Sequence, residues 1–252
     1  MPLEGHTRGQ TLGMRALGLP PPFQLVTLRE FGDAFVHACT HAAELGAGTL
    51  VFVGRFDLAE FAVVMEPDEP FAFAWRPLYA GMIALADAIA MLAPPKKRLA
   101  IEWPDAIRLD GRLVGGGRLG WPESADEAEP PPWLVFCAMI RTGSMAGDGS
   151  RLRPLTTALE DEGFEDTGSD RLVEGFARHF MRVIDHWREA GFAAIANSYV
   201  SRLERERGVS HGIGDGGELL LTRFGTPVER HGLGAKLAAP SWLDPRTREP
   251  RE

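Results

Sequence analysis

The apolar residues of this chain recur at helical spacing in three separate segments. Segment 30–45 carries such a stripe and is followed by Gly46, so we expect a helix that ends there. A second helix is predicted over 78–92, because a Pro-Pro pair follows it and cannot continue it. The strongest stripe predicts a helix up to Gly191, with a further helical run beyond it. Its apolar members are Leu172, Phe176, Phe180, Val183, Ile184 and Trp187.

Shorter apolar runs bounded by turn residues predict strands. Segments 49–53 and 58–65 form one such pair, and a further buried strand is expected over 133–140. Asp110-Gly111 is a tight-turn dipeptide that joins two more strands. Near the C-terminal end, glycine-rich turns alternate with short apolar runs, which predicts a small β unit. Helices and strands in an order that is not strictly alternating predict an α/β fold of the α+β kind, with a mixed sheet backed by helices.

Glycine, proline and charge mark the predicted boundaries along the chain. Residues 1–22 are polar and glycine-rich and end in three prolines, so we expect a flexible lead-in that is too short for a folded DNA-binding domain. The main domain is expected over 23–206, the small β unit over 207–245 and a tail over 246–252. No internal repeat is visible in the sequence.

Composition and charge narrow the classes of function. The chain has 252 residues, 44% of them hydrophobic and 25% charged, as is usual for globular proteins. Its 35 acidic and 27 basic side chains give a net charge of -8, which opposes binding to the phosphates of nucleic acids. No apolar run reaches the length of about 20 residues that a membrane span needs, and no secretion signal is visible, so no membrane is expected. Cys39 and Cys137 lack the spacing of a metal site and indicate a reducing cytoplasm.

One segment carries a motif with a known counterpart. Residues 101–119 read Ile-Glu-Trp-Pro-Asp-Ala-Ile-Arg-Leu-Asp-Gly-Arg-Leu-Val-Gly-Gly-Gly-Arg-Leu. This segment resembles, without a gap, a strand, turn and strand of biotin protein ligases that read roughly Lys-Trp-Pro-Asn-Asp-Ile, two residues, Asp-Gly, three residues, Gly-Gly-hydrophobic-Leu. The matching residues are Trp103, Pro104, Ile107, Asp110, Gly111, Gly115 and Gly116. The order of predicted helices and strands is also similar over about residues 23–237.

The resemblance implies the synthetase-like α/β domain that biotin and lipoate ligases share. It implies an enzyme that joins biotin or lipoate to AMP and then passes the acyl group to a lysine of a carrier domain. If that activity is retained, ATP and biotin or lipoate are the cofactors, and a biotin or lipoyl carrier domain is the protein partner. In the family, the lysine before Trp-Pro faces the carboxylate and the phosphate, where a cation stabilises developing charge.

The departures from the family's pattern fall on its charged groups. Glu102 occupies the position of the family's lysine, and an anion there repels the groups that a lysine attracts. Loss of a single stabilising group of this kind costs about 2.7–4 kcal/mol. The family's Asn-Asp pair becomes Asp105-Ala106, and its Gly-Arg-Gly-Arg loop over the acyl-adenylate shrinks to 54–57, Gly-Arg-Phe-Asp. We therefore assign no catalytic residue, and the first hypothesis is that ATP-dependent ligation is impaired or lost.

A different class of function stays open, namely an active biotin, lipoate or octanoate protein ligase or transferase with relocated catalytic residues. An octanoyl transferase needs no ATP and uses a cysteine as acyl acceptor. Cys137 is the candidate, but it lies inside the apolar run 133–140, where a cysteine is more often a small buried hydrophobic residue.

Two further patterns have ordinary structural explanations. Segments 115–120 and 212–217 both satisfy Gly-x-Gly-x-x-Gly, yet neither precedes a helix in a βαβ setting, so we interpret both as turn or strand glycines. His37 and His41 lie four residues apart on a predicted helix, and no third metal ligand is evident near them in the sequence. We predict no metal site.

The motif glycines predict a ligand pocket. Gly115 and Gly116 would let a ligand approach the strand backbone, as the matching glycines do in the family. The residues expected to line this pocket are Arg55, Glu102, Trp103, Asp105, Gly115, Gly116 and Arg118. A small-molecule acid or amide is the expected class of ligand, and the reversed charge favours a neutral or cationic one. The sequence thus describes a divergent, biotin/lipoate ligase-like protein that binds a small molecule or an acyl-carrier partner.

Overall fold

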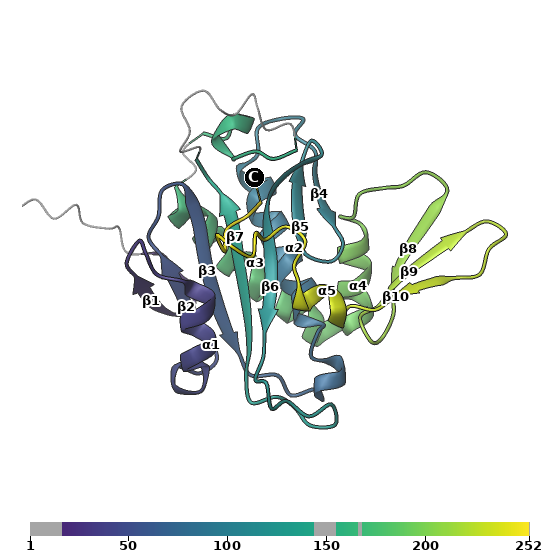
Figure 1. Cartoon of the computed structure of the whole chain (residues 1–252), viewed down its shortest axis with the longest axis horizontal. Helices are drawn as coiled ribbons and strands as arrows, with labels where there is room; N and C mark the ends of the chain where they lie inside the picture. Colours follow the sequence, from purple (N-terminus) through teal and green to yellow (C-terminus); the bar gives the residue numbers. More distant parts are fainter. Residues whose placement is uncertain (1–16, 144–154, 166–167, 252) are drawn as a thin grey trace, which may run out of the picture.

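The computed structural model describes residues 17–143, 155–165 and 168–251, and a mixed seven-stranded sheet forms its centre (Figure 1). The strands lie in the order β1-β2-β3-β7-β6-β5-β4. They are β1 (Gln24–Leu28), β2 (Thr49–Val53), β3 (Leu58–Met65), β7 (Leu134–Arg141), β6 (Arg112–Gly120), β5 (Ala106–Leu109) and β4 (Leu99–Glu102). Only the β1·β2 pair of this sheet is parallel, and the other neighbours are antiparallel. The predicted fold class, a mixed sheet backed by helices, is confirmed.

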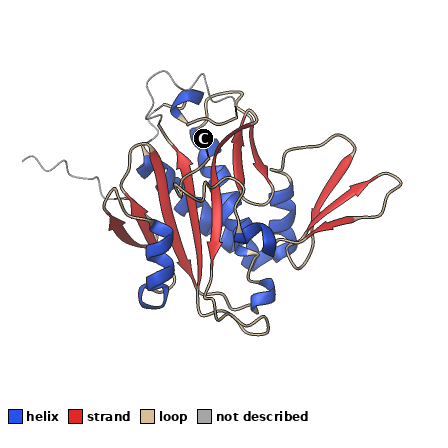
Figure 2. Cartoon of the chain, viewed as in Figure 1, coloured by secondary structure: helices blue, strands red, loops and turns tan. Residues whose placement is uncertain are grey.

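Helices cover the two faces of this sheet unequally (Figure 2). Helix α1 (Ala34–Leu45) packs on one face, against Val51, Ala62 and Cys137. Helices α2 (Pro77–Leu92), α3 (Ser169–Ala190) and α4 (Phe192–Val200) cover the other face. Phe176 of α3 illustrates this packing, since its ring stacks on Phe136 of β7 with a centroid distance of 5.6 Å. The helical face therefore carries the larger hydrophobic core.

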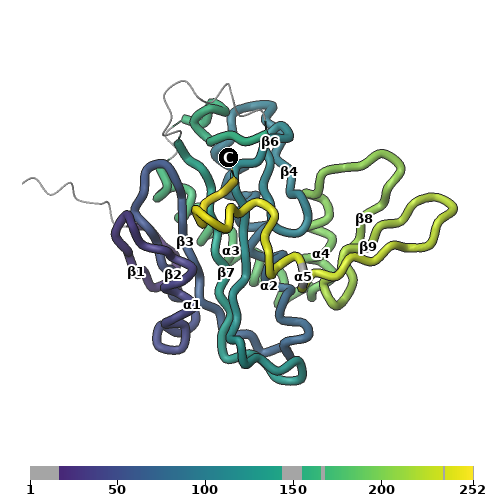
Figure 3. The backbone as a smooth tube through the Cα atoms, viewed as in Figure 1, coloured from purple at the N-terminus to yellow at the C-terminus, as the bar shows by residue number. Residues whose placement is uncertain are grey.

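A small antiparallel sheet follows in the sequence and projects from the side of the body beyond α4 (Figure 3). It consists of β8 (Val209–Ile213), β9 (Leu219–Arg223) and β10 (Glu229–His231), and the short helix α5 (Gly234–Ala238) comes next. The Tyr79 hydroxyl donates a hydrogen bond to the carbonyl of Gly217, which ties this sheet to α2. The division at residue 206 into two domains stays a prediction.

Several element boundaries differ from the predicted ones. The first helix begins at Ala34 rather than Glu30, because the Asp33 side chain caps it by accepting a hydrogen bond from the Val36 N–H at 2.8 Å. Phe31, which the helical stripe included, is 98% exposed. Strand β1 was not predicted, since its residues are largely exposed and show no alternation. Most of the predicted lead-in lies outside the described residues.

Among the described helices, none combines the length and the apolarity needed to cross a membrane.

Two helical glycines make opposite predictions about stability. At Gly81 of α2, an added Cβ would lie 2.4 Å from the Phe136 ring, whereas at Gly175 of α3 it would lie 3.5 Å from Ala88 Cβ, an ordinary contact. Gly81→Ala should lower the free energy of unfolding by roughly 1–3 kcal/mol because the site is overpacked. Gly175→Ala should raise it by up to about 1 kcal/mol through helix propensity. Urea unfolding of both variants measures this, and equal effects would contradict the packing described here.

Candidate functional site

The motif of residues 101–119 builds β4, β5 and β6 at one edge of the main sheet. The Trp103–Pro104 peptide is cis and lies in the turn between β4 and β5. Glu102 pairs with Ala106, Ala106 with Gly116, and Gly116 with Met139 of β7. Residues that are register partners point to the same face of a sheet, so these four positions share one face. Met139 and Cys137 are two residues apart on β7, so their side chains point to the same face of the sheet. Cys137 packs against α1, and α1 therefore covers a neighbouring part of this same face.

Glycine is required at two positions of β6. Gly115 has φ of +150°, and a Cβ there would lie 2.0 Å from the Met139 carbonyl oxygen. A Cβ at Gly116 would lie 2.2 Å from the Asp105 carbonyl oxygen and 2.6 Å from the indole of Trp242. The predicted close approach to the strand therefore exists, but the group that makes it is a side chain of the protein itself.

Trp242 belongs to residues 241–251, which we call the C-terminal segment. Its indole is 1% exposed, and its Nε1–H donates a hydrogen bond to the Gly117 carbonyl at 3.0 Å. Trp242 and Leu243 form a separate hydrophobic cluster on the main sheet with Leu58, Ala106, Leu113 and Met139. The chain thus returns from the small sheet to cover the half of this face that α1 leaves open.

The C-terminal segment is tied down at both of its ends. The Arg251 N–H donates to the Trp242 carbonyl at 2.7 Å, which closes the segment into a loop. Arg55 Nη1 forms an ion pair with Glu249 Oε1 at 2.7 Å, and Arg141 donates to the Pro250 carbonyl. Within residues 246–251, which are predicted as a tail, Pro250 is buried and Glu249 pairs with Arg55, so the predicted ligand residue Arg55 contacts this segment.

Glu102, at the position of the family's lysine, lies at the edge of the covered face. Its carboxylate pairs with Arg108 Nε at 2.6 Å, and its side chain is 45% exposed. Arg108 also donates to the Gly111 carbonyl, so the tight turn fixes this ion pair. The face of the sheet that carries Gly116, Ala106 and Met139 is called the Gly116 face below. The ion pair neutralises Glu102, and this position offers no cation that points toward the Gly116 face.

Asp105 carries a carboxylate that is buried and lacks a hydrogen-bond partner among the described residues. Burial and, to a smaller extent, the nearby charge of Glu102 raise the pKa of Asp105 to about 7. Lys236 of α5 and the indole N–H of Trp242 lower it in part. Since that N–H is committed to the Gly117 carbonyl, the indole gives the carboxylate only a secondary electrostatic contact.

A second buried polar group lies under the start of α1. The Arg118 guanidinium lies 3.6 Å from the centroid of the Phe35 ring, and its Nε and Nη2 atoms are buried without a hydrogen-bond partner in the described part of the chain. Glu60 of β3 accepts a hydrogen bond from the Ala34 N–H at 2.7 Å and is 3% exposed. Burial raises the pKa of Glu60 to about 7. Sequence reasoning missed Glu60, because a single acidic residue inside an apolar strand carries no motif.

The two cysteines flank this polar region but are not activated. Cys137 is fully buried, and desolvation raises the pKa of its thiol to about 12. Burial has the same effect on Cys39, whose pKa also rises to about 12. A thiol needs its thiolate form to act as a nucleophile. Neither environment favours the thiolate, which weakens the octanoyl transferase alternative.

Trp103 is the last of the seven predicted pocket residues to be placed, and it makes its contacts away from Trp242. Its indole Nε1–H donates to the Tyr79 hydroxyl of α2 at 3.2 Å, and its ring packs 6.4 Å from that of His231. Gly116 and Asp105 therefore lie beside Trp242, Gly115 lies against the Met139 carbonyl, and Arg55 contacts Glu249 of the same C-terminal segment. Glu102 lies at the edge of this group, Arg118 lies under α1, and Trp103 joins the small sheet to α2.

Comparison with known proteins shows to which family the chain belongs. The sequence model of the biotin/lipoate A/B protein ligase family matches residues 19–201. The chain belongs to this family. It is 27% identical over 176 residues to the biotin–[acetyl-CoA-carboxylase] ligase of Paracoccus denitrificans, a match that covers 68% of this chain and 66%, just under two thirds, of that enzyme.

Solved structures show the same fold for this member of the biotin/lipoate ligase family. A biotin protein ligase-like protein of unknown function from Silicibacter sp. TM1040 matches with a TM-score of 0.73 and 27% identity, over 86% of this chain and 96% of that one. The biotin protein ligase of Aquifex aeolicus in complex with biotin and ATP matches with a TM-score of 0.64 over 83% of this chain and 96% of that one. Its 12% identity shows a shared fold alone.

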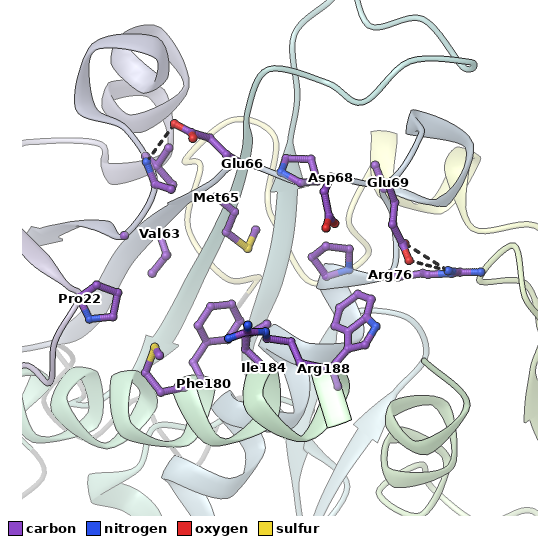
Figure 4. A pocket seen from close by; sticks show the side chains of 18 of the residues that line it. Pro22, Val63, Met65, Glu66, Asp68, Glu69, Arg76, Phe180, Ile184 and Arg188 are labelled. Atoms are coloured by element: carbon purple, nitrogen blue, oxygen red, sulfur yellow. Dashed lines mark hydrogen bonds and ion pairs between the residues drawn. The ribbon is translucent and has the colours of Figure 1, made fainter. Parts of the chain in front are cut away.

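This family member also has a cavity of about 710 Å³ on the helical side of the main sheet (Figure 4). Apolar side chains, among them Met65, Phe180 and Ile184, line it, and Asp68 lies at its rim. At the same rim, Glu69 pairs with Arg76 at 3.1 Å. Its lining includes none of the pocket residues predicted from the motif, so this cavity is separate from the Gly116 face.

The buried Glu60 makes stability depend on pH. Its folded pKa of about 7 lies above the ordinary value of 4.5, so the folded state holds more protons between these values and stability falls as pH rises through that window. Glu60→Gln keeps an acceptor for the Ala34 N–H and removes the charge. Relative to the parent protein, it should gain about 2 kcal/mol of unfolding free energy between pH 4.5 and 7.5.

Urea unfolding at several pH values measures this difference. Glu66→Gln is the matched control, because Glu66 also accepts a backbone N–H, that of Ala47, but is exposed. Parallel curves for the parent protein and Glu60→Gln would contradict the assignment of Glu60.

Proposed function

We propose that this chain does not adenylate biotin or lipoate, and that it binds a neutral or cationic small molecule on the Gly116 face. The observation that carries this proposal is the Glu102–Arg108 ion pair at the place of the family's lysine. A ligase needs a fixed cation that meets the negative charge developing on the acyl and phosphoryl groups. An anion there, already neutralised by its own neighbour, offers no such stabilisation.

The residues present do not fit a nucleoside triphosphate bound in the manner that the resemblance implies. The segment between β2 and β3, 54–57, is short, and Arg55 within it is held by Asp57 at 2.8 Å and by Glu249 at 2.7 Å. The indole of Trp242 lies directly against Gly116. A phosphate group would therefore find Arg55 already paired and the Gly116 face already filled.

Charge, fold and cysteine content suggest the ligand class, the protein partner and the compartment. Two acidic residues within the motif, Glu102 and the buried Asp105, favour a ligand without a free carboxylate. A biotin or lipoyl carrier domain stays a candidate partner, because the chain keeps the family's fold. Two free cysteines in the described residues are compatible with the cytoplasm, which we propose as the location.

One observation favours the alternative, an active ligase or transferase with relocated groups. Lys236 of α5 is exposed and lies near enough to Asp105 to lower its pKa. A lysine from α5 could then supply the cation that β4 lacks. This alternative makes a distinct prediction, because Lys236→Ala would abolish an activity that depends on it.

ATP–pyrophosphate exchange tests the first proposal and the ligase form of the alternative. With biotin, lipoate or octanoate supplied in turn, we expect no exchange above background from the unmodified chain, because Glu102 repels the phosphoryl charge. The Aquifex aeolicus ligase is the positive control. Exchange by the unmodified chain would contradict the first proposal, and a loss of at least about 100-fold in Lys236→Ala would then support the relocated lysine. Arg230→Ala, which removes an exposed cation of β10 instead, is the matched control for that variant.

A further inference from the structure

We propose that the cavity between β3 and α3 is a second binding site, and that it takes a small apolar zwitterion, an apolar molecule with one ammonium and one carboxylate group. The cavity lies on the helical side of the main sheet, so this proposal goes beyond the function proposed for the Gly116 face and does not depend on it. The size of the cavity, its apolar walls and two opposite charges at its rim carry the proposal.

The walls of the cavity are apolar and come from β3 and α3. Met65 ends β3, and Phe180 and Ile184 belong to the face of α3 that packs on the main sheet. The volume of about 710 Å³ lies within the range of about 300–1,000 Å³ that is usual for small-molecule sites. Such sites combine apolar walls with a few polar groups that fix the orientation of the ligand. The charged groups at the rim therefore decide which ligand fits.

Three of the five charged side chains that line the cavity already hold other groups of the protein. Glu69 pairs with Arg76 Nη1 at 3.1 Å, and Arg76 also donates to the Asp215 carbonyl at 2.8 Å. Glu66 Oε1 accepts a hydrogen bond from the Ala47 N–H at 3.2 Å. These contacts fix the three side chains in place and leave one acid and one base for a ligand.

The remaining two, Asp68 and Arg188, have neither a hydrogen-bond nor an ion-pair partner among the described residues. Asp68 follows β3, and Arg188 lies in the last turn of α3. Figure 4 shows them on opposite walls, with the Asp68 carboxylate directed toward α3. Arg188 lies one turn beyond Ile184 on the same stripe of the helix, so its side chain runs back along the cavity wall. The two opposite charges face the same cavity without pairing, and a ligand can bridge them.

A ligand that carries both charges satisfies both groups at once. Its ammonium group pairs with Asp68, and its carboxylate accepts hydrogen bonds from the guanidinium of Arg188. A ligand with a single charge leaves one rim group unpaired and places a like charge near it. An apolar amino acid or a short apolar peptide has the required chemistry, because its ends carry the two charges and its side chains contact the apolar walls.

Isothermal titration with the dipeptide Leu-Phe tests the proposal, because each of its two capped forms removes one charge from the same apolar body. N-acetyl-Leu-Phe lacks the ammonium group, and Leu-Phe amide lacks the carboxylate. Each should bind the unmodified chain at least about 10-fold more weakly than Leu-Phe, since each loses one charge-assisted contact. Equal affinity of the three probes, or no heat of binding with Leu-Phe at millimolar concentration, would overturn the proposal.

Two variants locate the ligand, because each should affect only the probes that carry the matching charge. Asp68→Asn should weaken the binding of Leu-Phe and of its amide at least about 10-fold and leave that of N-acetyl-Leu-Phe unchanged. Arg188→Gln should weaken the binding of Leu-Phe and of N-acetyl-Leu-Phe and leave that of the amide unchanged. Both residues are exposed, so neither substitution should disturb the fold. The same loss for all three probes in either variant would contradict the assigned contacts.

Asp185→Asn and Arg182→Gln are the matched controls, since they change exposed charges of α3 that do not line the cavity. Neither should alter the affinity for Leu-Phe, and a loss equal to that of the rim variants would count against the site. Phenylalanine, as a fourth probe, separates the two sources of the ligand. Binding at least as tight as that of Leu-Phe indicates a single amino acid, and weaker binding indicates a peptide. None of these measurements uses pyrophosphate exchange, so this proposal and the proposed function can fail independently.

Discussion

The close packing around the glycines of β6 is the constraint on which the rest of the structure depends. Gly115 lies against the Met139 carbonyl and Gly116 against the Asp105 carbonyl, both closer than any side chain would allow. Gly117 faces the opposite layer, where a Cβ would lie 2.8 Å from Met82 Sδ of α2. One short run of glycines therefore sets the distance from the sheet to the α2 layer on one face. On the other face it makes room for the C-terminal segment.

Buried polar side chains near these glycines lower the stability of the fold. Asp105 is buried and its carboxylate lacks a hydrogen-bond partner in the part of the chain that is described, and Glu60 is almost fully buried with one backbone donor. Arg118 is partly buried and has only the Phe35 ring and, at 4.0 Å, the Asp33 carboxylate beside it. Groups of this kind destabilise a folded protein unless a partner satisfies them. They are rare in ordinary cores and common where ligands bind. Their concentration on one face distinguishes this face from the cavity beside α3, whose charged groups lie at an exposed rim.

The sequence was sufficient for those features that depend on local pattern. The helix predicted over 78–92 and the strands over 49–53 and 58–65 agree with α2, β2 and β3 to within one residue, because each is a continuous apolar run. The motif predicted two strands joined at Asp110-Gly111 and a close approach to the backbone at Gly115 and Gly116, and the structure divides the first of these strands into β4 and β5. Strand β1 was missed because its exposed residues give no alternation, and the capping side chain of Asp33, rather than the apolar stripe, sets the start of α1.

Trp242 shows why the site itself could not be predicted from the sequence. It lies 126 residues after Gly116 in the chain, in a segment with neither helical nor strand period, and only the folded structure brings the two together. A glycine pair in a strand indicates that something approaches the backbone, but it does not say whether that is a ligand or another part of the same chain. In this structure the approaching group is Trp242, whose indole N–H donates to the Gly117 carbonyl and leaves the buried carboxylate of Asp105 without a hydrogen-bond partner among the described residues.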